Sequence, residues 1–295
     1  MKLQFSGHDS FICKHFWLKK GYDFIQTGNK SFKDELAVVD LGVGKNMVTA
    51  ISYWLKAYGI TDNSNHITEL GHYLFNNQNG VDPYLENFGS IWLLHYLLIK
   101  TNKASIYNLF FNEFRRDKVQ FTKEQLSNFL IRQLKSNEQN NVNVNTLNAD
   151  ITVFIRNYLK AAFKNKKTDV EEEFSNLFID LQFMESYQSE NAEEKTVEWY
   201  KVENDVRWDL PYQVVLFTIL DNSNYGSSIS FKELLSGYNS PGCVFALNEE
   251  GLYNKIDKIQ SKYSEITYTE SVGVRELQFK SKPDKWKALN DYYNS

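Results

Sequence analysis

The sequence predicts a mainly α-helical protein with short β wings, built from tandem modules that resemble winged helix-turn-helix domains. Apolar residues recur at helical spacing along most of the 295 residues, whereas strand-like alternation is short and scattered. A helix, a glycine-containing turn and a second helix occur in this order near the N-terminus, and a helix-turn-helix pattern with a longer turn returns at 123–158. We therefore expect a winged helix-turn-helix-like domain at 1–80, a basic helical domain at 81–170, and an acidic linker with a C-terminal winged-helix-like domain at 171–295.

The clearest helix-turn-helix pattern lies within residues 32–60. Residues 33–41 are predicted as a first helix, and residues 45–58 have apolar side chains at helical spacing. Between them, Gly42 and Gly44 suit a tight turn, because glycine adopts a positive φ without strain. The opposite face of the second helix is polar and has no acidic residue, which favours contact with DNA. Its predicted contact residues are Lys45, Asn46, Thr49, Ser52, Tyr53 and Lys56.

A second interpretation of the same stretch is a phosphate-binding loop of a nucleotide-binding protein. A P-loop requires Gly, four residues, Gly-Lys and then Ser or Thr. Here Val39 occupies the position of the first glycine and Asn46 that of Ser or Thr. The dinucleotide fingerprint also fails, because Met47 stands where its third glycine belongs. We therefore expect no cofactor, while a helix pair that only packs or binds another protein remains an alternative.

The other predicted elements follow from helical periodicity, capping residues and turn residues. Residues 17–25 precede the helix-turn-helix pattern as its first helix, and residues 91–99 form a core helix with a packed His95. Thr122 and Gln125 form a capping box for the helix that follows them. The remaining expectations are a loop at 186–195, helices at 144–158, 212–220, 230–235 and 247–263, and strands at 199–202, 266–270 and 275–279.

The charges are distributed unevenly, although the net charge is only −4. Residues 1–60 contain eight lysines and five acids, and residues 101–169 contain twelve basic and six acidic side chains. Residues 171–209 are strongly acidic. Since basic segments are the ones that bind DNA phosphates, we expect further contacts in the first two regions. They are Lys19, Lys20, Asn145, Thr146, Asn148 and Arg156.

The sequence offers few groups for catalysis or metal binding. Cys13 and Cys243 form no CxxC pair, and the histidines form no HExxH motif, so we expect no metal site. His8 stands beside Asp9, a pair that can exchange protons, but Asp9 is equally placed to cap a helix starting near Phe11. No apolar leader and no membrane-length apolar run is present, which predicts a cytoplasmic protein without membrane contact.

Several segments together resemble a bacterial family of unknown function, DUF4007. They are FSGHDSF (5–11), WLKKG (17–21), LGVGKNMV (41–48), YWLKAYGI (53–60), TLNADI (146–151) and SPGCVFAL (240–247). The resemblance implies a role near DNA phosphorothioation or phage-defence genes, with a partner similar to phosphoadenosine phosphosulfate reductase. It implies no catalytic residues. Asp9 and Lys14 stand where this family more often has Glu and Arg, and a lysine lacks the bidentate reach of arginine.

We therefore expect a non-enzymatic subunit that binds or positions double-stranded DNA in a modification or defence system. The alternative is a scaffold that recruits a sulfur-transfer or nuclease partner through the acidic segment 171–209, without contacting DNA. A third hypothesis is an enzyme that uses His8 and Asp9 as acid and base. Burial of both side chains, bound to the backbone, would reject that hypothesis.

Overall fold

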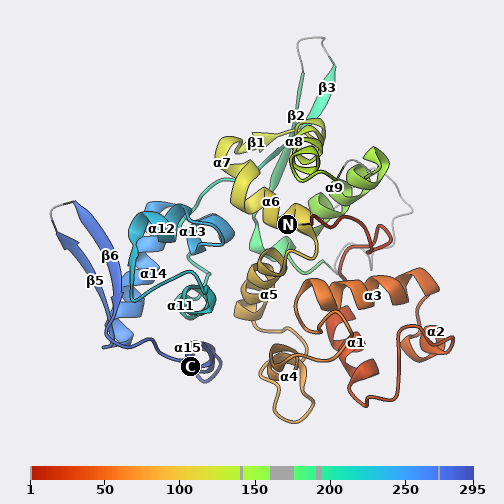
Figure 1. Cartoon of the computed structure of the whole chain (residues 1–295), viewed down its shortest axis with the longest axis horizontal. Coiled ribbons are helices and arrows are strands. Elements are labelled where there is room, and N and C mark those ends of the chain that lie inside the picture. Colours follow the sequence, from red (N-terminus) through yellow and green to blue (C-terminus); the bar gives the residue numbers. More distant parts are fainter. Residues whose placement is uncertain (1, 140–141, 160–175, 191–194, 272) are drawn as a thin grey trace. The chain divides into compact units, whose positions relative to one another are not determined.

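The computed structural model is mainly helical and contains two three-stranded antiparallel sheets in its described parts (Figure 1). It describes residues 2–139, 142–159, 176–190, 195–271 and 273–295. The contacts divide the chain into two compact units, Met1–Val202 and Glu203–Ser295, whereas the sequence predicted three domains. The expected boundary at residue 80 falls inside the first of these units.

The first unit is a helical assembly with one small sheet. Its helices in the described ranges are α1 (Trp17–Ile25), α2 (Ala37–Leu41), α3 (Lys45–Ala57), α4 (Glu69–Phe75), α5 (Phe88–Thr101), α6 (Ser105–Leu109), π-helical η1 (Phe110–Phe114), α7 (Arg115–Asp117), α8 (Lys123–Ser136), α9 (Val144–Tyr158) and the 3₁₀ turn η2 (Ile179–Leu181). The capping box of Thr122 and Gln125 is present at the start of α8, as predicted. The bounds of α1 and α9 match the predicted ranges.

The N-terminal helices α1, α2 and α3 pack against one another (Figure 1). Gly42 ends α2 with a φ of 61°, the left-handed conformation that the glycine-containing turn required. The predicted helix 33–41 is wrong in its first half, since α2 covers only Ala37–Leu41. The carboxylate of Asp34 accepts the backbone N–H of Ser31 at 2.7 Å, and this local bond holds the preceding residues in a turn.

Helix α5 lies in the core of the first unit and is buried on nearly all sides. His95 is fully buried, and its Nδ1 lies 3.1 Å from the hydroxyl of Tyr158 on α9. The ring of Phe183 stacks on His95 with centroids 4.5 Å apart, and Phe111 meets the same ring edge-on. His95 is therefore the packed core histidine that the sequence predicted.

The sheet of the first unit is antiparallel, with β3 at its centre. Its strands are β1 (Gln120–Phe121), β2 (Glu185–Glu190) and β3 (Thr196–Lys201), in the order β1-β3-β2. The predicted loop at 186–195 is wrong over 186–190, because β2 pairs with β3 along six residues and Tyr187 stacks on Trp199. Residues 191–194 lie outside the described residues. The predicted strand at 199–202 is largely contained in β3.

In its described residues, the second unit combines five helices with a small antiparallel sheet. Its elements in the described ranges are α11 (Tyr212–Asp221), β4 (Ser228–Ser230), α12 (Phe231–Ser236), the short helix α13 (Pro241–Val244), α14 (Glu249–Lys262), β5 (Ile266–Ser271), β6 (Val274–Phe279) and α15 (Lys285–Tyr293). The sheet order is β4-β6-β5, and α11 packs against α14 and α15 (Figure 1). Helices α11, α12 and α14 and strands β5 and β6 confirm the sequence prediction. Within the described ranges, no helix is both long and apolar enough to cross a bilayer.

Candidate nucleic-acid interface

Helix α3 presents the polar face that the sequence predicted as a DNA contact. Lys45, Asn46 and Thr49 are exposed, while the opposite side of the helix, including Ile51 and Trp54, is fully buried. Lys45 and Asn46 on the first turn and Thr49 on the second thus carry a cation, an amide and a hydroxyl. These are the side chains that bind phosphate oxygens and base edges in DNA complexes.

The N-terminus of α3 adds a second attraction for anions. Gly44 is its N-cap residue, and no side chain accepts a hydrogen bond from the first-turn amides. The first backbone N–H groups of a helix have no partner within the helix, and the helix dipole adds partial positive charge there. The start of α3, beside Lys45, is therefore suited to a phosphate group.

Beside this face lies a cavity of about 310 Å³, which we call the lysine pocket. Its described lining residues come from five segments of the chain and contain three lysines and no carboxylate. They are Gly7, Phe32, Lys33, Thr49, Ser52, Tyr53, Lys56, Asn65 and Lys103. The structure thus brings the predicted contact residues Ser52 and Lys56 together with Lys33 and Lys103, two lysines that the sequence did not single out.

The lysine pocket has a positive potential. The pKa of Lys56 is lowered, first by partial burial and then by repulsion from Lys103 and Lys33. Attraction by the carboxylate of Asp62 raises the pKa of Lys56, but the net shift is still downward. The carboxylate of Asp62 also accepts the backbone N–H groups of Ser64 and His66, each at 2.8 Å. The carboxylate of Asp62 is therefore already hydrogen-bonded to backbone N–H groups.

Tyr53 contributes less to the interface than predicted. Its side chain is buried, and its hydroxyl donates to the backbone carbonyl of Lys103 at 3.4 Å. Burial raises the pKa of Tyr53 far above its usual range, so the phenol stays neutral. Tyr53 forms part of the pocket wall and does not extend toward solvent as a DNA-binding side chain would.

The prediction that Lys19 contacts phosphate is wrong for this structure, because the side chain is buried. It is 5% exposed, and its ammonium donates to Asp23, to the side-chain oxygen of Asn77 and to the carbonyl of Phe75. An isolated buried charge is costly, so this lysine is held by nearby oxygens and does not reach solvent. Its neighbour Lys20 is exposed and donates to the carbonyl oxygen of Leu41 at 3.1 Å.

The predicted contacts on α9 are at least partly accessible but do not join the lysine pocket. Asn145 and Asn148 are exposed, and Thr146 and Arg156 are half-buried. None of these four residues lines the pocket beside α3. Their DNA contacts therefore stay a prediction separate from the α3 face.

The sequence missed a buried pair that joins the N-terminal loop 5–11 to α9. Nε2 of His8 lies 3.1 Å from Oδ1 of Asp150, and both side chains are buried. Nδ1 of His8 accepts the backbone N–H of Ser10 at 3.2 Å, so Nε2 is the nitrogen that donates to Asp150. Asp150 also accepts the N–H of Ser6 at 2.9 Å. One signal was available in the sequence, because Asp150 interrupts the apolar stripe of its helix.

Neither role that the sequence suggested for Asp9, pairing with His8 or capping a helix, is formed in the structure. Asp9 is exposed, and the proposed helix starting at Phe11 is wrong, because residues 11–16 contain no helix. Asp9 and Ser10 have φ angles of 46° and 63°, which no helix N-terminus adopts. His8 stacks on Trp54 with centroids 5.7 Å apart, so the His8–Asp150 pair positions the loop against α3.

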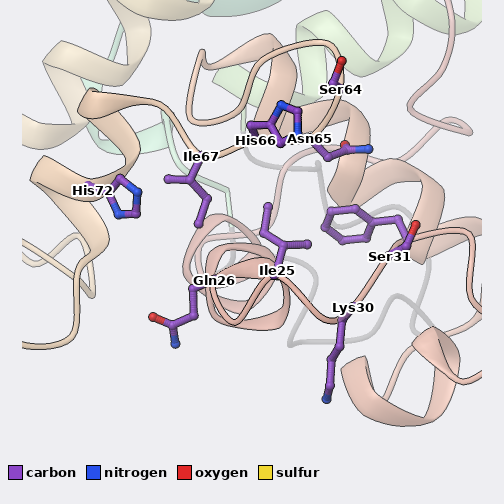
Figure 2. A pocket seen from close by; sticks show the side chains of 11 residues that line it. Ile25, Gln26, Lys30, Ser31, Ser64, Asn65, His66, Ile67 and His72 are labelled. Atoms are coloured by element: carbon purple, nitrogen blue, oxygen red, sulfur yellow. The ribbon is translucent and has the colours of Figure 1, made fainter.

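A second cavity, of about 380 Å³, shares the lining residues Phe32 and Asn65 with the lysine pocket. Figure 2 shows His66 and Asn65 on the loop between α3 and α4, with Gln26 and Lys30 on the segment that follows α1. Nδ1 of His66 lies 3.1 Å from the carboxylate of Asp62. In the described ranges, no group of three or more His, Cys, Asp or Glu side chains is placed to hold a metal ion.

Comparison with known proteins gives both a family and a fold. The model of the family described as "Protein of unknown function (DUF4007)" matches residues 5–293. A solved structure described as magnesium ion-bound SspB is similar, with 27% identity and a TM-score of 0.85. A second, described as SspB, has 26% identity and a TM-score of 0.82, and both comparisons cover 99% of this chain and 88% of the other. No curated protein matches the sequence significantly. Since the family model spans nearly the whole chain, this protein belongs to the DUF4007 family.

Proposed function

We propose that this protein is a non-enzymatic accessory subunit that binds or positions double-stranded DNA in a bacterial DNA-modification or phage-defence system. The phosphorothioation or defence context comes from the family resemblance. The DNA-binding role rests on one observation: α3 exposes Lys45, Asn46 and Thr49 from a helix whose N-terminus has no side-chain cap. Support is added by the lysine pocket beside this face.

The dimensions and chemistry of α3 suit the major groove. Its 13 residues extend about 20 Å at the usual helical rise, which is enough to lie across the groove. Asn46 carries the amide that pairs bidentately with adenine, while Lys45 and the first-turn amides meet the backbone phosphate. In this arrangement Asn46 contributes sequence preference, and Lys45 contributes affinity that depends on salt.

We further assign a winged-helix module to the second unit. The order α11-β4-α12-α13-α14-β5-β6, with the sheet order β4-β6-β5, supports this assignment. In such a module α14 would occupy the place of the recognition helix. Its outward residues include Glu249, Glu250 and Asp257, all exposed. Because carboxylates repel DNA, we assign duplex binding to α3 and not to α14.

The test is duplex binding by the full chain, measured by fluorescence anisotropy between about 50 mM and about 200 mM salt. Lys45→Glu is expected to weaken binding at every salt concentration and to lower the slope of log affinity against log salt by about 1. The matched control is Lys232→Glu, which reverses an exposed lysine on α12. Unchanged affinity in Lys45→Glu, with its circular dichroism intact, rejects the α3 face.

A second candidate function is a scaffold that binds a protein partner of the sulfur-transfer or nuclease class. The observation that favours it is β2, an edge strand whose six residues are all exposed and which carries Glu185 and Glu190. Exposed edge strands pair readily with another chain. If the scaffold role holds, partner capture survives Lys45→Glu and is lost in the variant that combines Glu185→Gln with Glu190→Gln. Capture that is unaffected by neutralising both acids rejects this role for β2.

A further inference from the structure

The lysine pocket brings together positive charges that form no ion pair with the described residues around them. In the part of the chain that the structure describes, Lys33 and Lys56 have no side-chain hydrogen bond or ion pair. Among the described residues, Nζ of Lys103 donates to the neutral amide oxygen of Asn63, at 3.5 Å. Like charges that converge with no acid in the lining repel one another, so folding alone gives no reason for this arrangement.

The polar groups between the lysines are arranged to donate. The hydroxyl of Ser52 donates to Oδ1 of Asn65 at 3.0 Å, which leaves the amide NH₂ of Asn65 as a donor. Ser52, Asn65 and the three lysines all line the same cavity. A site rich in donors and cations, with no carboxylate, selects an oxyanion.

One wall of the pocket is held rigidly by the loop 5–11. Ser6 has a φ of 66°, and a residue with a side chain keeps such a conformation only where surrounding contacts enforce it. Here the enforcing contact is Asp150, whose carboxylate accepts the N–H of Ser6 and pairs with His8. The pocket is therefore preorganised on this side, which reduces the entropy lost when a ligand binds.

The size of the pocket limits the ligand. About 310 Å³ lies at the lower end of the range of ~300–1,000 Å³ that is typical of ligand pockets, and a small group or a strand end fits such a volume better than stacked bases. A phosphomonoester carries a charge of about −1.5 to −2 at neutral pH, against −1 for a backbone diester. Three lysines complement the more highly charged group better.

We propose that the lysine pocket binds a phosphate dianion, either inorganic phosphate or the terminal phosphomonoester of a nucleic-acid strand. The ammonium groups of Lys33, Lys56 and Lys103 surround the anion, and the amide of Asn65 donates to it. For the strand-end source, the inference rests on the proposed DNA-binding function. For inorganic phosphate it stands independently.

The first experiment is isothermal titration of the full chain with inorganic phosphate at constant ionic strength. The wild type is expected to bind, and the variant that combines Lys33→Gln with Lys103→Gln is expected to bind at least about tenfold more weakly. Lys232→Gln is the matched control, since Lys232 is an exposed lysine on α12 that does not line the pocket. Phosphate also acts on proteins without binding to a specific site. A heat signal that is equal in wild type and double variant would report only such an effect and would overturn the proposal. The absence of binding would overturn it as well.

The second experiment identifies the source of the anion. Duplexes with 5′-phosphate, 3′-phosphate or hydroxyl ends are compared in anisotropy titrations. A preference for one phosphorylated end that is lost in the double variant identifies a strand end, whereas binding of inorganic phosphate without any end preference identifies the free anion. If Lys45→Glu leaves duplex affinity unchanged while phosphate binding persists, the α3 face fails and the lysine pocket stands.

Discussion

The ring of Tyr53 lies directly against Gly7, so that a Cβ atom at Gly7 would come within 2.6 Å of Cδ2 of the tyrosine. This contact joins the loop 5–11 to α3 at the wall of the lysine pocket. Gly7 also has a φ of 106°, which a residue with a side chain rarely adopts. The segment FSGHDSF, which carried part of the family resemblance, thus has a physical reason for its glycine.

Gly7→Ala is expected to lower the free energy of unfolding by on the order of 2–4 kcal/mol, from the clash with Tyr53 and the unfavourable φ together. The matched control is Gly28→Ala. Gly28 has a φ of 71° but nothing within 4 Å of a built Cβ, so this variant carries only the backbone cost. Urea unfolding measures the free energy of unfolding of the two variants. Equal losses in the two variants would show that the Tyr53 contact is irrelevant to stability.

Lys255 gives a pH-dependent prediction in the second unit. Burial, with added repulsion from Lys258, lowers the pKa of Lys255 from its usual 10.5 to about 8, although Asp209 opposes the shift. Between those two values the unfolded chain binds more protons at this side chain than the folded chain does. Stability therefore rises with pH in that window, and the cost of burying the ammonium is fully present below it.

The measurement is the free energy of unfolding in urea of the wild type minus that of Lys255→Met, from about pH 7 to about pH 10. This difference is expected to increase through the window above pH 8 and to be flat below it. Tyrosines such as Tyr263, whose pKa is raised by burial, contribute alike to both proteins and cancel. A difference that does not change with pH contradicts the lowered pKa of Lys255.

Local signals in the sequence were sufficient for the long helices and for one face of the site. Apolar spacing predicted α3 to within one residue at its C-terminus, because this helix buries one stripe against the core. The capping box at Thr122 fixed the start of α8 in the same way. The exposure of Lys45 and Asn46 follows from the same periodicity, since they lie opposite the buried stripe.

The features that the sequence did not reveal depend on contacts between distant segments. Strand β2 has no buried residue, so no apolar alternation marks it, and its pairing with β3 defines it. Likewise, nothing near Lys33 or Lys103 indicates that both line one cavity with α3. The partner of His8 is Asp150 on α9, whereas adjacency in sequence suggested Asp9.

Lys19 offers the sharpest contrast between sequence pattern and structure, because it was predicted as a phosphate contact and is buried instead. Lys19→Met removes the cation that holds Asp23, Asn77 and the carbonyl of Phe75. The expected result is a loss of about 1–3 kcal/mol of stability, with the duplex affinity of the folded protein unchanged. Urea unfolding and anisotropy at one salt concentration test both, with the exposed neighbour Lys20→Met as control. Should Lys19→Met weaken DNA binding more than Lys20→Met while stability is retained, the ammonium must leave its buried site to reach DNA, and the observed hydrogen bonds would not represent the DNA-bound state.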